Sequence, residues 1–223
     1  MSIVVGIKQK NKVWLACDKQ VTAGDTKAFL VTPHNKIVSV PERPGIIVGS
    51  VGYLRGINLL ETNNSYIDEL CYYRKQIDYN YMVNAFPLLL NELYCTHGFI
   101  VREEGKPLNL ENKFLLATPE SLFEIGNDGS VLEINRTAIG SGGELALGAL
   151  SSYQRDDYSD KEMIEILRKA IKAASYNTGC GGGCIIMNTD SNKIYDFEEL
   201  KDLKFENSLK KRYNIIVKKW ATL

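Results

Sequence analysis

The chain has 223 residues, of which 44% are hydrophobic and 24% are charged, an ordinary composition for a soluble globular protein. Lys and Arg together number 27, as do Asp and Glu, so the net charge is zero. This balance disfavours nucleic-acid and membrane-surface partners, and no apolar run approaches the ~18 residues of a membrane-spanning helix. The length favours one domain over residues 1–223.

The cysteines are odd in number and lie mostly in apolar segments: Cys17, Cys71, Cys95, Cys180 and Cys184. This pattern is typical of reduced thiols, so we expect a cytoplasmic protein without a disulfide framework. Cys180 and Cys184 frame three glycines, but no second Cys or His pair at ligand spacing accompanies them. The sequence therefore predicts neither a metal nor a cofactor.

The chain opens with two short apolar runs, residues 3–7 and 13–17, separated by a polar Lys/Asn segment. Runs this short and rich in β-branched residues predict a β-hairpin. A buried strand that starts at the second residue would also bury the chain terminus. Because a buried ammonium group needs a partner or must lose its proton, this position is unusual.

Residues 19–35 are rich in Thr, Gly, Ala and Asp, and we expect an exposed connection there. Strand patterns follow at residues 36–40 and 45–51. Together with the first hairpin they predict a β-meander of at least four strands.

Helical periodicity begins after Gly52. A first segment reaches Tyr73 with an interruption near residues 63–65, and Ser65 with Asp68 would cap its second half. A second helical segment covers residues 80–97. Pro87 inside it predicts a kink or a late helix start.

The middle and end of the chain combine short strands with two more helices. Four strands are expected at residues 99–102, 114–118, 121–125 and 131–134, with Asn127-Asp128-Gly129 as a hairpin turn. A glycine-rich segment, 138–143, leads into a helix over 144–153. Ser159 and Glu162 form a capping box before another helix, and further strands are expected at 184–188, 193–195 and 213–217.

Strands and helices therefore occur in blocks, which favours an α+β fold over alternating βα units. Two antiparallel sheets packed face to face, with a helix pair on each outer face, would use every element. The sequence thus predicts a four-layer αββα sandwich.

Ser2 is a candidate nucleophile. Initiator Met is generally removed before a small residue, and a terminal Ser would combine a hydroxyl with an α-amine of pKa about 7.7–8.0. Such an amine can be a free base near neutral pH and can activate the hydroxyl of its own residue. The alternative is that Ser2 simply follows the start codon.

Four segments together resemble proteasome β-type subunits, most closely the bacterial HslV-type peptidases of the N-terminal nucleophile (Ntn) hydrolases. They are Ser2-Ile-Val-Val, Leu15-Ala-Cys-Asp18 followed by Gln20 and Thr22, Lys36-Ile-Val, and Ala138-Ile-Gly-Ser141-Gly-Gly. Each motif is short, and their joint order and spacing carry the resemblance, which spans nearly the whole chain.

The resemblance implies a catalytic role for each of five residues. Ser2 would attack the peptide carbonyl, Lys36 would lower the pKa of the Ser2 amine, and Asp18 would pair with Lys36. Gly52 would donate its N–H to the oxyanion, and Ser141 would belong to the same centre. Thr22, Gly49 and Ser50 would bind substrate, with residues 29–31 and Tyr53 also near the cleaved residue.

The implied function is a threonine/serine-type Ntn endopeptidase subunit in a ring-shaped, self-compartmentalised protease that degrades unfolded polypeptides. The ring would be a hexamer or heptamer, with stacked rings as one form, and an ATPase unfoldase would be its partner. Two alternatives stay open: an Ntn amidohydrolase that acts on a small amide, and a catalytically inactive, structural subunit.

Three departures from the family pattern bear on these alternatives. Ser2 stands where Thr is the rule. Ser175, Thr178 and Gly179 stand where the family has an Asp, a Ser and a Gly, so the carboxylate that would orient the terminal amine is missing. Met1 precedes Ser2, and its retention would convert the amine to an amide.

Overall fold

The computed structural model describes residues 2–40, 43–63, 77–101, 105–191 and 193–198. Met1, Cys71, the expected Ser65/Asp68 cap and the expected strand at 213–217 lie outside these residues. Among the described helices, none is both long and apolar enough to cross a membrane.

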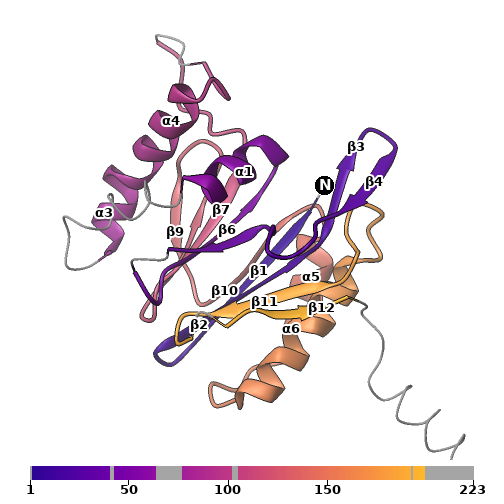
Figure 1. Ribbon diagram of the computed structural model, residues 1–223. Helices are drawn as coiled ribbons and strands as arrows, with labels where there is room; N and C mark the ends of the chain where they lie inside the picture. Colours follow the sequence, from indigo (N-terminus) through magenta and orange to yellow (C-terminus); the bar gives the residue numbers. More distant parts are fainter. Residues whose placement is uncertain (1, 41–42, 64–76, 102–104, 192, 199–223) are drawn as a thin grey trace, which may run out of the picture.

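Two five-stranded antiparallel sheets form the centre of the molecule (Figure 1). The first sheet has the order β10-β1-β2-β11-β12, with bounds Arg136–Gly140, Ile3–Gln9, Lys12–Asp18, Cys184–Asn188 and Tyr195–Phe197. The second sheet has the order β5-β6-β7-β8-β9, with bounds Ile37–Ser39, Ile47–Val51, Lys113–Ala117, Leu122–Ile125 and Val131–Glu133.

Helices cover the outer face of each sheet (Figure 1). Helices α5 (Gly143–Leu150) and α6 (Asp160–Ala174) pack on the first sheet. Helices α1 (Leu54–Thr62), α3 (Tyr79–Asn84) and α4 (Phe86–Thr96) pack on the second sheet. The predicted four-layer α+β sandwich is therefore confirmed.

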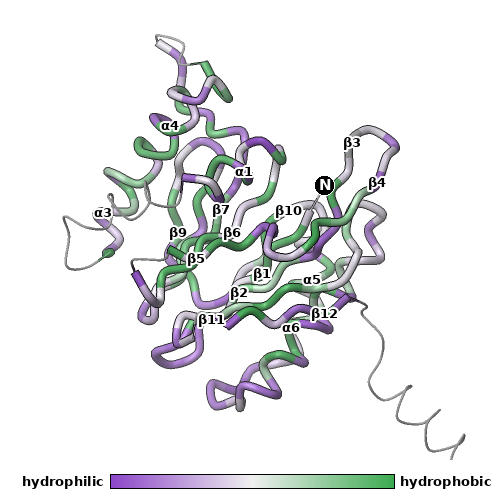
Figure 2. The backbone as a smooth tube through the Cα atoms, in the orientation of Figure 1, coloured by the Kyte–Doolittle hydropathy of each residue, from purple (hydrophilic) through white to green (hydrophobic). Residues whose placement is uncertain are grey.

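The first hairpin is apolar on both faces because both of its faces are buried. Ile3, Val5 and Ile7 pack against α5 and α6, whereas Val4 faces the second sheet. Figure 2 shows this as nearly continuous hydrophobic colour along β1, β2 and β11. A strand buried on two faces loses the alternation of apolar and polar residues, and the run at residues 3–7 has this pattern.

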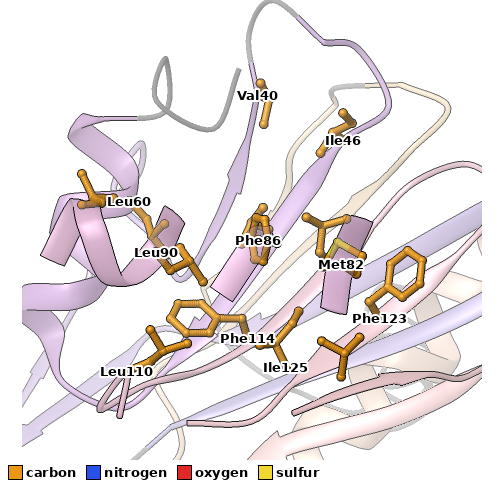
Figure 3. Packing of buried hydrophobic residues seen from close by; sticks show 14 of the residues in the cluster. Val40, Ile46, Leu60, Met82, Phe86, Leu90, Leu110, Phe114, Phe123 and Ile125 are labelled. Carbon is orange, nitrogen blue, oxygen red and sulfur yellow. The ribbon is translucent and has the colours of Figure 1, made fainter. Parts of the chain in front are cut away.

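Large apolar side chains fill the layer between the second sheet and its helices. Figure 3 shows Phe86 and Leu90 of α4 and Phe114 of β7 within this cluster. Phe86 and Phe114 are fully buried, and a buried aromatic side chain contributes several kcal/mol to folding. This half of the molecule is held together by apolar packing.

The predicted four-stranded meander is wrong. The first hairpin belongs to one sheet, and the strands at 37–39 and 47–51 belong to the other. Residues 19–35 also contain a separate hairpin, β3 (Gln20–Ala23) and β4 (Thr26–Phe29). Every residue of β4 is exposed, so its sequence lacks the apolar alternation that identifies a half-buried strand.

Other elements and boundaries also differ from expectation. Residues 99–101 form no strand, because Phe99 instead packs its ring edge-on against Tyr94, with centroids 4.9 Å apart. Residues 136–140 form β10, which pairs with β1 and was not expected. Helix α5 ends at Leu150, three residues before the expected end.

Two predicted helix-terminal signals, Pro87 and the Ser159/Glu162 capping box, are confirmed. Pro87 stands in the first turn of α4, so the segment over 80–97 is divided into α3 and a late-starting α4. At α6, Ser159 accepts a hydrogen bond from the Glu162 backbone, and the Glu162 side chain accepts one from the Ser159 backbone. This is the expected capping box.

Candidate active site

A carboxylate lies beside the first residues of β1. Asp18, the last residue of β2, is fully buried, and its Oδ1 accepts the Ile3 N–H at 3.1 Å. Its Oδ2 accepts the Gly181 N–H at 3.0 Å. Ser2 precedes Ile3 directly and is only 5% exposed. The register of β1 against β2 therefore places Asp18 next to the start of the chain.

Lys36 brings a buried positive charge to the same place. Its Nζ lies 2.5 Å from Asp18 Oδ1 and 2.5 Å from the Gln20 carbonyl oxygen, and the residue is 1% exposed. A buried ammonium requires such an opposite charge and further acceptors to remain protonated. Asp18 and Lys36 thus form a closed ion pair beside Ser2.

Local backbone structure explains why Lys36 reaches this position. It lies directly before β5, and its carbonyl oxygen accepts the Ser50 N–H of β6 at 2.9 Å. The Asn35 side chain accepts the Ile37 N–H at 2.7 Å, which fixes the turn that enters the strand. Lys36 therefore crosses from the edge of the second sheet to a carboxylate of the first.

Gln20 connects the β3–β4 hairpin to this pair. Its side chain donates to the Thr22 hydroxyl at 3.2 Å and to the Thr178 carbonyl at 2.9 Å, while its backbone carbonyl binds Lys36. Gln20 is 3% exposed. The Thr22 hydroxyl is therefore hydrogen-bonded to the same residue, Gln20, whose backbone carbonyl binds the Lys36 ammonium.

The turn after β10 contacts the Ser2 backbone. Gly140 has φ 106°, and a Cβ atom there would lie 2.2 Å from the Ser2 carbonyl oxygen, so only glycine fits without displacement. The Ser141 hydroxyl lies 3.5 Å from the same oxygen and 3.7 Å from Cys180 Sγ. The Ser141 side chain therefore lies beside the Ser2 backbone, and its membership of a catalytic centre stays a prediction.

Gly49 and Ser50 lie near the end of β6. A Cβ at Gly49 would lie 2.7 Å from the Val4 side chain, so this position faces β1 in the layer between the sheets. The Ser50 hydroxyl is buried and accepts the Asn112 side-chain amide at 3.1 Å. Gly49 pairs with both β5 and β7, and the Ser50 N–H donates to the Lys36 carbonyl, so both residues are part of the sheet and their substrate-binding role stays a prediction.

Gly52 has φ 132° and lies against Asn112, whose Oδ1 would be 2.7 Å from an added Cβ. The residue is exposed, and its N–H donates to no other residue in the described parts of the chain. An unpaired N–H after a strand can act as an anion donor. Among the described residues, no hydrogen bond joins Gly52 to Ser2, so the oxyanion role of the Gly52 N–H stays a prediction.

Ser175 does not take the place of the missing carboxylate. It is the C-terminal cap of α6, and its hydroxyl donates to the Lys172 carbonyl at 2.7 Å. Thr178 contributes its backbone carbonyl, which accepts the Gln20 amide. The α6–β11 loop thus contributes two neutral backbone groups, the Gly181 N–H to Asp18 and the Thr178 carbonyl to Gln20.

Sequence reasoning gave no role to the Gln20 side chain, Asn177, Cys180 or Gly181. The Asn177 side chain donates to the Ser141 carbonyl at 2.9 Å, and Gly181 holds Asp18. Burial, with the nearby Asp18 charge as a smaller cause, raises the pKa of the Cys180 thiol. The only sequence signal for these contacts is Asn177 two residues before Gly179, a spacing typical of an Asx turn.

The Cys17 thiol is buried on the inner side of β2. Burial raises its pKa to about 12, so it is a neutral core side chain and not a nucleophile. Burial likewise raises the pKa of Cys184 well above its usual value. The nucleophile candidates at this centre are therefore hydroxyl groups.

Comparison with known proteins shows that the chain is similar to proteasome subunits. Residues 115–189 match the family model described as "Proteasome subunit". The chain is 29% identical to "Proteasome subunit beta 1" of Thermococcus kodakarensis over 214 residues, covering 89% of this chain and 94% of that one. It is 28% identical to "Proteasome subunit beta" of Nanoarchaeum equitans, covering 78% and 85% of the two chains.

One plant relative has a higher identity over a shorter stretch, and the fold extends the likeness to solved structures. "Proteasome subunit beta type-5-B" of Arabidopsis thaliana is 35% identical over 103 residues, 44% of this chain and 34% of that one. The structure titled "Thiobacillus denitrificans BPH" covers 83% of this chain and 96% of its own, with a TM-score of 0.60 and 20% identity. A second structure of that protein, in complex with Epoxomicin, gives the same TM-score. At this identity the likeness shows the fold.

Proposed function

From its similarity to proteasome β-type subunits, we propose that this chain is a proteasome-like peptidase subunit with Ser2 as its nucleophile. It would act in a ring-shaped, self-compartmentalised protease on unfolded polypeptides. The observation that carries the proposal is the buried pair of Asp18 and Lys36, joined to the backbone N–H of Ile3 beside Ser2.

The pair supports this role because burying two charges costs free energy. A buried ion pair is often no more stabilising than apolar residues of the same volume, so its presence needs another reason. An ammonium group close to the start of β1 would favour the unprotonated form of a terminal amine and would stabilise negative charge that develops on a nearby oxygen. Both effects serve a terminal nucleophile.

The proposed reaction has two stages. The Ser2 Oγ attacks the peptide carbonyl carbon, and its proton passes to the Ser2 α-amine, directly or through water. The tetrahedral oxyanion accepts a hydrogen bond from the Gly52 N–H, the C–N bond breaks, and the protonated Ser2 α-amine gives its proton to the leaving nitrogen. Water then attacks the ester carbonyl carbon and gives a proton to the Ser2 α-amine; the bond between this carbon and Ser2 Oγ breaks, Oγ takes the proton back from the amine, and the acyl group leaves as a carboxylic acid.

This mechanism requires removal of Met1, because only a terminal Ser2 has a free α-amine. Ser141 would lie against the Ser2 carbonyl and fix the position of that residue. Thr22, Gly49 and Ser50 would lie along the bound substrate. A polypeptide substrate, a homo-oligomeric ring and an ATPase unfoldase are the partners that this function needs.

One observation favours a second candidate, a catalytically inactive structural subunit. The Ser175 hydroxyl binds the Lys172 carbonyl at the end of α6, so no carboxylate at this position would orient the terminal amine. In that case the fold would serve ring assembly, and the buried pair would hold the two sheets together.

Hydrolysis of a fluorogenic peptide by the purified protein and by Ser2→Ala separates the two candidates. The proposal predicts a loss of kcat of at least about a thousandfold in Ser2→Ala, because the nucleophile is removed. Ser2→Thr, which keeps the hydroxyl, is the matched control and should retain activity. Full activity in Ser2→Ala would overturn the proposal, and rings without activity in either protein would support the structural subunit. Turnover of a small amide by a monomer would indicate an amidohydrolase instead.

A further inference from the structure

Asn177 links two turns that lie far apart in the sequence. It follows α6, and its Nδ2 donates to the Ser141 carbonyl, 36 residues earlier, at 2.9 Å. Its Oδ1 accepts the Gly179 N–H of its own loop at 2.9 Å. One amide side chain thus stabilises its own turn with its oxygen and binds the neighbouring turn with its nitrogen.

The turn that Asn177 holds covers Cys180. A Cβ at Gly142 would lie 2.9 Å from Cys180 Sγ, and the Ser141 hydroxyl lies 3.7 Å from the same sulfur. Cys180 is 4% exposed, and its N–H donates to the Asn177 carbonyl at 3.0 Å. The turn containing Ser141 therefore lies on the loop that begins at Asn177.

We propose that Asn177 is a positioning residue for Ser141, and that its Nδ2–H keeps the Ser141 hydroxyl beside Ser2. The inference rests on the proposed function in that Ser141 belongs to the catalytic centre. Ser175 is engaged at Lys172, so Asn177 is the polar side chain of this loop that reaches the Ser141 turn. It does so without charge.

Two substitutions separate the two hydrogen bonds of Asn177. Asn177→Asp keeps an oxygen for the Gly179 N–H but cannot donate to the Ser141 carbonyl, and it places a negative charge against that oxygen. Asn177→Ala loses both bonds. Asn84→Asp is the matched control, because Asn84 Nδ2 also donates to a backbone carbonyl, that of Asn80 at 2.8 Å, on the distant helix α3.

The first readout is the labelling rate of Cys180 by a disulfide reagent such as DTNB, which does not depend on activity. Cys17 and Cys184 are buried thiols with raised pKa values and should stay unlabelled, and Cys180→Ala identifies the Cys180 signal. Loss of one hydrogen bond that holds the covering turn should raise the rate about fivefold to tenfold in Asn177→Asp and Asn177→Ala. Asn84→Asp should label like the unmodified protein.

Labelling of Asn177→Asp at the unmodified rate would overturn the proposal, since the loop bond to Gly179 alone would then be sufficient. The second readout is peptide hydrolysis, in which Asn177→Asp should lower kcat about tenfold and leave KM within about twofold. An unchanged kcat in an active enzyme would also overturn it. The proposed function fails separately if Ser2→Ala retains activity, or if none of the proteins hydrolyses peptide. In either case the labelling rate of Cys180 still decides whether Asn177 holds the Ser141 turn.

Discussion

The two five-stranded sheets are similar in architecture, but polar and charged side chains are buried at one end of the first sheet and mainly apolar side chains beside the second. The second sheet and its helices enclose a mainly apolar cluster that includes Phe86, Tyr94 and Phe114. The end of the first sheet where β1 begins encloses Asp18, Lys36 and Gln20 instead, each of them at most 3% exposed. The apolar cluster stabilises the fold. The buried polar side chains cost free energy of desolvation, which apolar residues in the same place would not.

If the proposed function holds, stability and catalysis depend on different regions of the molecule. Apolar burial stabilises in proportion to area, whereas a buried ion pair recovers little more than its own desolvation. Substitutions at the polar end should therefore remove activity, and substitutions in the apolar half should remove stability without changing the chemistry of folded molecules.

Lys36→Met should have the largest effect. It leaves the buried Asp18 carboxylate without its cation, so we expect a loss of about 3–5 kcal/mol in the free energy of unfolding and at least about a thousandfold in kcat. Denaturant unfolding and peptide hydrolysis measure the two effects. The double variant Asp18→Asn/Lys36→Met should regain part of the stability but no activity; activity in either variant would contradict the assigned role of Lys36.

Phe114→Ala should be comparably destabilising but catalytically silent. Removing this fully buried ring should lower the free energy of unfolding by about 3–5 kcal/mol. The activity per folded molecule should stay unchanged at temperatures where the variant is folded. Leu132→Ala, at a side chain on β9 that is 59% exposed, is the control and should change stability little. A large fall in kcat for folded Phe114→Ala would break the distinction between the two regions.

Gly140→Ala should affect both stability and activity. Its φ of 106° and the 2.2 Å approach of a new Cβ to the Ser2 carbonyl predict a cost of about 1–3 kcal/mol and displacement of Ser2. The control is Gly148→Ala in α5, where no atom lies within 4 Å of an added Cβ and alanine should stabilise the helix by up to about 1 kcal/mol. Equal thermal stability of the two variants would show that Gly140 is not constrained.

Ser159→Ala should have the smallest effect. It removes the cap of α6, far from the ion pair, and should lower the free energy of unfolding by about 1 kcal/mol with kcat unchanged. Loss of kcat without loss of stability would contradict this assignment to the stabilising part of the molecule.

The same variant tests a pH dependence. The Ser159 side-chain and backbone hydrogen bonds hold the pKa of Glu162 below its ordinary value of 4.5. A carboxylate with a lowered folded-state pKa stabilises above the unfolded pKa, and this contribution is lost as the pH falls through the folded pKa. In Ser159→Ala the NMR titration of Glu162 should therefore move toward 4.5. An unchanged titration would show that Ser159 does not lower this pKa.

The layers of the fold were predictable because their signals are local. The apolar runs of β1 and β2, the capping box of α6 and Pro87 at the start of α4 each lie within a few residues. The β3–β4 hairpin was missed because every residue of Thr26–Phe29 is exposed. Residues 99–101 were wrongly predicted as a strand because the apolar Phe99 side chain packs on Tyr94 and is not part of a sheet. Strand β10 was missed because its glycine-rich end was taken as a turn alone.

The site was predictable only where a family pattern named its residues. Ser2, Asp18, Lys36 and Ser141 come from that pattern, and the structure brings them together at one end of the first sheet. The Gln20 contact with Thr178 spans 158 residues and the Asn177 contact with Ser141 spans 36, so no local spacing could indicate them. Such contacts follow from the sheet register, which the sequence of one strand does not determine.

The intact mass of the purified chain tests the central claim most directly, since the proposed mechanism needs Ser2 at the terminus. The account predicts the mass of a chain that lacks Met1, together with peptide hydrolysis by that protein. A mass that includes Met1 in protein that cleaves peptides would contradict a terminal nucleophile.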